Sequence, residues 1–180
     1  MEVLAVLLIL VAGAAVAVWL YIANQGDAHF QFIVDQRTDF TLAEITQAAA
    51  TFKATVPFVN NGTQDGTLMD VFPRHFLPGE QFDAVDTDVR LTLNSANRSD
   101  GYWEAYIVPF NTGGAVILTV TFTAKSGDIR EALKDMVDMP IDIIFQVVAR
   151  SPWYIDKNRL VMTAAEIHKA LAAGQQAAVR

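Results

Sequence analysis

The 180-residue sequence contains no cysteine. This absence excludes a disulfide-stapled domain, a lipid attached through an N-terminal thiol and a cysteine nucleophile. Basic residues are also few: the 13 Lys and Arg are scattered, all of them after position 36, and the formal net charge is −7. Because no basic cluster is available to contact phosphates, we expect no nucleic-acid binding.

Motifs of catalysis and cofactor binding are missing as well. There is no GxSxG nucleophile turn and no glycine-rich phosphate loop, and the histidines have no metal-ligand spacing. The histidines are His29, His75 and His168, and we expect His75 to be a polar surface residue. The densest acidic group comprises Glu80, Asp83, Asp86 and Asp88. It lacks a complete calcium-loop pattern, so we interpret it as a solvated loop, with Ca²⁺ as the alternative. We therefore expect no enzyme activity, no cofactor and no metal.

The N-terminus, in contrast, has a long hydrophobic run. Val3 to Ile22 contains twenty residues without a charge, and as a helix it would span roughly 30 Å, the thickness of a bilayer's hydrocarbon core. Trp19 and Tyr21 close the run, where we expect them at the membrane interface. These features predict a transmembrane anchor over residues 1–26. The alternative is a cleaved signal peptide, but there is no basic n-region and the run continues past the candidate site at Ala15–Ala17.

The orientation of this helix has no strong signal, because no Lys/Arg cluster flanks it. With Met1 and Glu2 ahead of the span, the simplest topology is a single-pass protein of the cell membrane with its C-terminal domain extracytoplasmic (periplasmic). Small residues four apart let a second helix approach closely, although Ala and Gly are also common in transmembrane helices. The stripe predicted to make this contact is Ala5, Ile9, Gly13 and Ala17.

After the anchor, alternating hydrophobic residues predict strands separated by turn residues. The expected strands are 29–35, 51–59, 67–72, 85–93, 102–110, 115–124, 141–149 and 159–163. The turn residues Asn111–Gly114 predict that strands 102–110 and 115–124 form a hairpin, and strands 141–149 and 159–163 predict a second pair. Pro73 and Pro78 indicate an irregular connection. Pro57 and Pro109 lack a backbone donor, so we expect them at an edge, a bulge or a strand end.

Two capping boxes predict short helices, one starting at Asp128–Glu131 and one at Thr163–Glu166. The fold class expected is therefore mainly β: a single N-terminal transmembrane helix followed by an Ig-like antiparallel β-sandwich with one or two short helices. The sandwich is expected to cover residues 27–165, and residues 166–180 to form a short helix and a frayed tail.

The segment Ala54–Gly62, an alternating strand followed by Asn-Asn-Gly, resembles the opening of bacterial extracytoplasmic Ig-like and late-embryogenesis type-2-like domains. It covers about a tenth of the chain. The resemblance implies a β-sandwich that serves in adhesion, spacing or assembly, and it assigns no functional residue. The disulfide and tryptophan pattern of antibody domains is absent, because there is no cysteine.

Two segments with aromatic residues after the anchor are candidates for partner binding. Trp103 lies in an alternating segment and is expected to be a core residue rather than a binding residue. Pro152, Trp153 and Tyr154 follow a predicted strand, and aromatic residues on loops are enriched in interface hot spots. These three residues are predicted partner contacts, with local packing as the alternative.

These features favour a non-catalytic accessory subunit, anchored in the lipid bilayer and packed on the extracytoplasmic face of a larger complex of other membrane protein subunits. The main reason is that only about seven residues separate the hydrophobic run from the first strand, which keeps the domain near the bilayer. An alternative is a membrane-tethered binding module for a small ligand, lipid or metal. A pilin-like filament subunit is a third hypothesis, but the basic leader of such proteins is missing.

Overall fold

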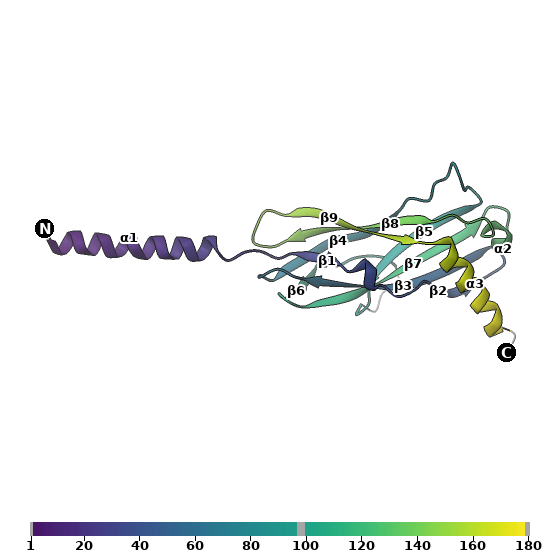
Figure 1. Cartoon of the computed structure of the whole chain (residues 1–180), viewed down its shortest axis with the longest axis horizontal. Coiled ribbons are helices and arrows are strands. Elements are labelled where there is room, and N and C mark those ends of the chain that lie inside the picture. The colour runs from purple at the N-terminus through teal and green to yellow at the C-terminus, as the bar shows by residue number, and fades with distance from the viewer. Residues whose placement is uncertain (1, 97–99, 179–180) are drawn as a thin grey trace.

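The computed structural model describes residues 2–96 and 100–178, and it is mainly β with antiparallel sheets and three α-helices (Figure 1). Helix α1 (Glu2–Ala23) has no buried residue. Within the described part of the chain it is the one helix long and apolar enough to cross a membrane, by length and composition. A linker of seven residues, 23–29, joins the hydrophobic run to a β-sandwich that extends along the same long axis.

Nine strands form two antiparallel sheets, as the sequence predicted for the fold class. Sheet A contains β1 (Phe30–Phe32), β2 (Thr41–Ile45), β3 (Ala49–Asn60), β5 (Val85–Leu93) and β7 (Gly113–Ala124). Its order is β1-β3-β7-β5, and β2 also pairs with β3. Sheet B contains β4 (Gly66–His75), β6 (Tyr106–Val108), β8 (Met139–Val148) and β9 (Tyr154–Met162), in the order β6-β4-β8-β9.

The core lies between the two sheets and follows from the period-two alternation of the strands. Every second residue of β3 from Ala50 to Asn60 is buried, and so is every second residue of β8 from Met139 to Val147. Aromatic rings join the layers: the Phe32 and Phe145 ring centroids are 5.1 Å apart. The predicted core residue Trp103 is also buried, and its indole N–H donates to the Leu68 carbonyl at 3.2 Å.

The predicted hairpin between 102–110 and 115–124 is wrong, because its two arms lie in different sheets. Strand β6 pairs with β4 in sheet B, whereas β7 pairs with β3 and β5 in sheet A. The turn is held by β3: the Asn111 N–H donates to the Asn60 carbonyl and the Asn60 N–H to the Thr112 carbonyl. Turn chemistry predicts a chain reversal, but it does not decide whether the two arms bond to each other.

Pro57 is also not where it was expected, since it lies inside the twelve-residue β3. Its carbonyl accepts from the Ile33 N–H, and in an antiparallel strand a residue's N–H and C=O point the same way. The nitrogen of Pro57 therefore faces the gap between β1 and β2, the two short strands that share this side of β3. No ladder hydrogen bond is lost there. Pro109, as predicted, follows the end of β6.

Several strands differ from the prediction: β1 and β6 are shorter than the expected 29–35 and 102–110, and β9 begins five residues before the expected 159–163. Strand β2 was not predicted, because Ala43 and Glu44 have low β propensity and the strand is a short edge with a register shift. Strand β4 continues through Pro73 to His75, after a bulge at which Asp70 has φ +47°. The second predicted pair is confirmed, since β8 and β9 form an antiparallel hairpin.

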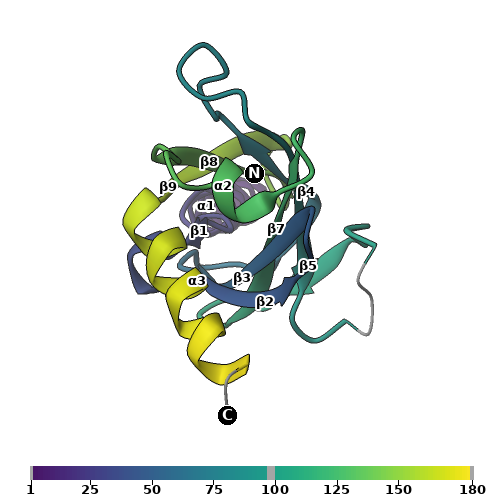
Figure 2. The same cartoon turned by 90° about the vertical axis from the view of Figure 1, so that its right-hand side faces the viewer.

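Both predicted helix caps are present. The Asp128 carboxylate accepts from the Arg130 and Glu131 N–H groups at the start of α2 (Ile129–Ala132). Before α3 (Ala164–Ala178), Thr163 and Glu166 exchange side-chain to backbone hydrogen bonds, both 3.2 Å. Figure 2 shows α2 at the end of the sandwich opposite α1, and α3 beside β2. A 3₁₀ turn, η1 (Val34–Gln36), connects β1 to the segment before β2.

Candidate interaction surfaces

The outer face of sheet B carries a group of exposed hydrophobic side chains. Strand register places these residues on one side, because directly paired residues of antiparallel strands share a face. Ile107 is 69% exposed, Ile155 61% and Phe72 49%. Together with three neighbours they form what we call the apolar patch: Met69, Phe72, Ile107, Ile144, Val148 and Ile155. A shallow hollow of about 230 Å³ on this face is lined by Phe72, Ile144 and Ile155 together with the polar residues Asp70 and Gln146.

A charged row adjoins the apolar patch on the side away from α1. Asp142 is only 1% exposed, and its carboxylate accepts from Arg159 at 2.6 and 3.0 Å and from Lys157 at 3.2 Å. These cations hold the pKa of Asp142 below its ordinary value, Arg159 having the largest influence, although burial acts in the opposite direction. The guanidinium groups of Arg74 and Arg159 each lie about 5 Å from the Phe76 ring centroid (5.2 and 5.1 Å).

Sequence reasoning missed the apolar patch, although a signal was present. Strand β8 has hydrophobic residues at consecutive positions, Ile143–Phe145 and Val147–Val148, rather than a polar residue at every second position. Such near-continuous apolar strands are typical of sheets covered on both faces. Even so, the sequence could not show which strands align with β8 or that their outward residues are also hydrophobic.

A second structured region lies at the junction of the anchor and the sandwich. Asp27 accepts from the backbone N–H groups of Arg150 and Ser151 at 3.1 and 3.0 Å. A hydrogen bond from the Ser151 side chain has the largest influence on its pKa and, with the backbone N–H groups of Ala28, Ser151 and Arg150, holds it below the ordinary value against the effect of burial. The Arg150 guanidinium donates to the carbonyls of Ile22 and Gly26. It thereby supplies a cation and a donor where the last carbonyls of α1 have no helical partner.

The loop between β3 and β4 fastens the other side of the linker. Thr63 and Gln64 both donate to the Gln25 carbonyl, at 2.9 and 3.1 Å. The side chain of Asn60, which is fully buried, accepts from the N–H groups of His29 and Gly62. Gly26 has φ +63°, and a Cβ there would lie 2.3 Å from the Thr63 hydroxyl. The linker is therefore a fixed connection between the helix and the sandwich.

The predicted partner contacts lie close to this junction. Pro152 and Trp153 are exposed in the turn between β8 and β9, and Trp153 is 62% exposed. Tyr154 is the first residue of β9 and is half-buried, and this burial raises its pKa. The three residues are thus not one surface, because Tyr154 packs toward the core while Trp153 faces away from it.

The side chains predicted to contact a second helix all lie on α1 and are exposed, and nothing lies within 4 Å of a Cβ built at Gly13. The interface aromatics Trp19 and Tyr21 are 66% and 68% exposed, in the last turns of the helix. Whether these positions contact lipid or another helix stays a prediction.

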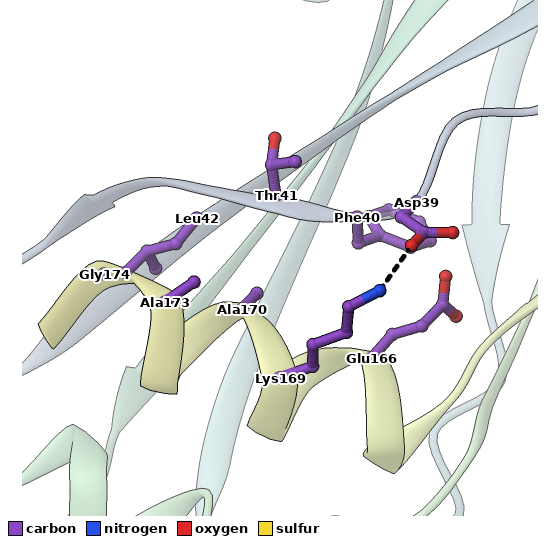
Figure 3. A pocket seen from close by; sticks show the side chains of 9 residues that line it. All are labelled: Asp39, Phe40, Thr41, Leu42, Glu166, Lys169, Ala170, Ala173 and Gly174. Atoms are coloured by element: carbon purple, nitrogen blue, oxygen red, sulfur yellow. Dashed lines mark hydrogen bonds and ion pairs between the residues drawn. The ribbon is translucent and has the colours of Figure 1, made fainter. Parts of the chain in front are cut away.

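A groove of about 420 Å³ lies on another side of the sandwich, between β2 and α3. Figure 3 shows Leu42 of β2 opposite Ala173 and Gly174 of α3, with the Asp39–Lys169 ion pair (2.9 Å) across one end. A Cβ at Gly174 would lie 2.5 Å from the Leu42 side chain, so glycine lets the helix approach the strand. The groove is mainly apolar.

An arginine secures α3 beside this groove. Arg37 forms a two-pronged ion pair with Glu166, at 2.8 and 2.9 Å, and also donates to the Val161 carbonyl. Burial raises the pKa of Glu166, but the hydrogen bonds from Arg37 and Thr163 outweigh it and hold that pKa below its ordinary value. The start of α3 is therefore joined to the segment after η1.

The acidic group and the histidines do not converge. Lys125 pairs with Asp83 and Asp86, and Asp88 pairs with Arg90. Residues 2–96 and 100–178 contain no group of three His, Asp or Glu side chains placed to hold a metal ion. The surface position expected for His75 needs correcting: it is half-buried at the end of β4, burial lowers its pKa, and its Nδ1 is buried without a hydrogen-bond partner.

Comparisons with known proteins give a fold likeness and no family. No family model and no curated protein sequence matches this chain. The chain is similar in structure to the GAE domain of GGA2p from Saccharomyces cerevisiae, with 7% identity, TM-score 0.34, and 74% and 96% of the two chains covered. It is similar to the structural-genomics target SoR45, with 12% identity, TM-score 0.37 and 78% and 87% covered. It is also similar to the GAE domain of yeast GGA1, with 8% identity, TM-score 0.31, and 70% of this chain and 97% of that chain covered.

Proposed function

We propose that this protein is a non-catalytic, single-pass membrane-anchored accessory subunit whose sandwich docks through the outer face of sheet B onto the extracytoplasmic part of a membrane protein complex. The observation that carries the proposal is the apolar patch on a domain joined rigidly to an apolar helix. Exposed apolar side chains gathered on one face and bounded by charged groups are typical of protein–protein contact sites. Here Thr67 and Gln146 lie among the apolar residues.

The position of the apolar patch favours a partner that is itself in the membrane. Val148 is the last residue of β8 and Ile155 the second residue of β9, so both lie close to the β8–β9 turn, which the Asp27–Arg150 contact ties to the linker. The patch therefore begins at the end of the sandwich next to α1, and a protein covering it must reach the membrane surface. The charged row that contains Asp142 and Arg159 would form the polar rim of the same contact.

Native mass spectrometry after mild detergent extraction tests this function. We expect the wild-type chain in a stoichiometric complex with other membrane proteins, and the double variant Phe72→Asp, Ile155→Asp as a lone protomer. Lys53→Asp, an exposed change on the outer face of sheet A, is the matched control and should retain the complex. A complex that survives the double variant would show that the patch is not the contact.

The groove between β2 and α3 favours a second candidate function, the binding of a small apolar ligand or lipid. Its volume is within the range of small-molecule sites, and its mainly apolar lining includes a few polar side chains, among them the ion-paired Asp39 and Lys169. The same mass spectra distinguish the two functions, because a lone wild-type protomer that carries a bound small molecule supports the second. Ala173→Phe would then displace that molecule by filling the groove.

A further inference from the structure

Two exposed aromatic side chains lie on turns at the end of the sandwich next to α1. Trp153 is 62% exposed in the β8–β9 turn, and Phe110 is 53% exposed in the β6–β7 turn. Both turns are anchored to the linker. In the β8–β9 turn, the backbone N–H groups of Arg150 and Ser151 donate to the Asp27 carboxylate. The Phe110 N–H donates to Asp65, in the loop whose Thr63 holds Gln25.

The depth of these turns follows from the contact of Arg150 with α1. Its guanidinium donates to the carbonyl of Ile22, the last residue of the hydrophobic run. Trp153 is three residues beyond Arg150, at most about 10 Å of chain from the Cα of Arg150, and the Arg150 side chain bridges from there to Ile22. The headgroup region outside the hydrocarbon core is roughly 5–8 Å thick. Figure 1 shows the β8–β9 turn at the end of the sandwich that faces α1. This turn, which carries Trp153, is therefore on the side of the domain nearest the membrane whenever α1 spans the bilayer.

We propose that Trp153 and Phe110 insert into the lipid headgroup region and form a second point of membrane contact beside the span. This inference rests on the membrane anchoring in the proposed function. Aromatic rings at this level extend the belt begun by Trp19 and Tyr21, because indole and phenyl rings are favoured at the membrane–water interface. With the rigid linker, a second contact fixes the tilt of the sandwich and hence the height of the apolar patch above the membrane.

In this proposal the aromatic rings, rather than electrostatic attraction, bind the turns to the membrane surface. Arg150 is the one cation in the β8–β9 turn, and its guanidinium is already engaged by backbone carbonyls. The chain has a formal net charge of −7, and an acidic domain is not attracted to anionic headgroups. Insertion should therefore be as strong in zwitterionic phosphatidylcholine as in mixtures with phosphatidylglycerol.

Fluorescence quenching by brominated phosphatidylcholine tests the proposal on the full chain in vesicles. In a Trp19→Phe background only Trp103, which is buried, and Trp153 emit. We expect bromines near the top of the acyl chain to quench part of this emission, and bromines near the chain end to quench less. The quenched part should disappear in the Trp19→Phe, Trp153→Phe variant, which changes an exposed residue and should melt at the same temperature.

Equal, negligible quenching in these two variants would overturn the proposal. The wild-type chain separates this result from a failure of anchoring: emission from Trp19, obtained as the difference between wild type and Trp19→Phe, must be quenched if α1 is inserted. Quenched Trp19 with unquenched Trp153 rejects headgroup insertion alone, whereas unquenched Trp19 rejects the membrane anchoring on which both proposals rest. Quenching of Trp153 only in the presence of phosphatidylglycerol would contradict the aromatic mechanism.

Discussion

The two outer faces of the sandwich have opposite chemistry, although both belong to antiparallel sheets that cover the same core. The face of sheet A presents threonine rows, and the hydroxyls of Thr51 and Thr121 are 3.1 Å apart across β3 and β7. No large hydrophobic side chain on its strands, all of which the structure describes, is exposed. The face of sheet B presents the apolar patch. Covering apolar surface is favourable by about 25 cal/mol per Å². A partner that covers the outer face of sheet B would therefore gain this free energy, whereas one on the face of sheet A would gain little of it.

The largest effect we expect is a loss of folding stability that distinguishes a residue on the inner side of sheet B from one on its outer side. Phe145→Ala should lower the free energy of unfolding by about 3–5 kcal/mol, because it leaves a cavity against Phe32 in the core. Ile155→Ala, on the exposed side, should change it by less than about 0.5 kcal/mol. Urea unfolding of the full chain in detergent, followed by circular dichroism, measures both. A large loss for Ile155→Ala would mean that the apolar patch stabilises the fold and is not reserved for a partner.

A second prediction concerns the charged row on sheet B. Asp142 has a lowered pKa in the folded protein, so its ionised form stabilises the fold above the unfolded-state pKa of about 3.9, and this contribution is lost as the pH falls through the folded-state value. Asp142→Asn should cost about 1.5–3 kcal/mol at neutral pH, and the difference from wild type should shrink in acid.

Urea midpoints at neutral pH and at about pH 2 test this dependence. Glu44→Gln, a change at an exposed carboxyl on β2, is the control and should leave stability unchanged at both pH values. A constant difference between Asp142→Asn and wild type across this range would contradict the ionic role of Asp142.

The smallest effect is expected on sheet A. A double-mutant cycle with Thr51→Val and Thr121→Val should give a coupling energy of about 0.2–1 kcal/mol, since the two hydroxyls form one hydrogen bond on a solvated face. Neither variant should alter complex formation. If valines on sheet A created a new association, detectable as a shift in sedimentation, exposed apolar surface alone would be enough for docking, and the position of the sheet B patch would lose its significance.

Local patterns in the sequence predicted several elements well, and their limits have a common cause. The capping box at Thr163–Glu166 and strand β5 are local features, so they could be identified without tertiary information. The hairpin predicted across Asn111–Gly114 failed because pairing depends on residues far away, here Asn60. The position of Pro57 could not be predicted for the same reason: it depends on where β1 and β2 end along β3.

The amino-acid sequence alone was enough to establish that this protein is an apolar helix followed by a β-sandwich. The signals were side-chain alternation, helix caps and one uninterrupted hydrophobic run, and each lies within a short stretch of chain. Strand register decided the rest. It gathered Ile107, Phe72 and Ile155, from three separate strands, on one face, and the β8–β9 hairpin brought Arg150 to the end of α1. A surface of this kind exists only once distant segments are paired, because period-two patterns set which side a residue occupies in its own strand but not which strands lie next to it.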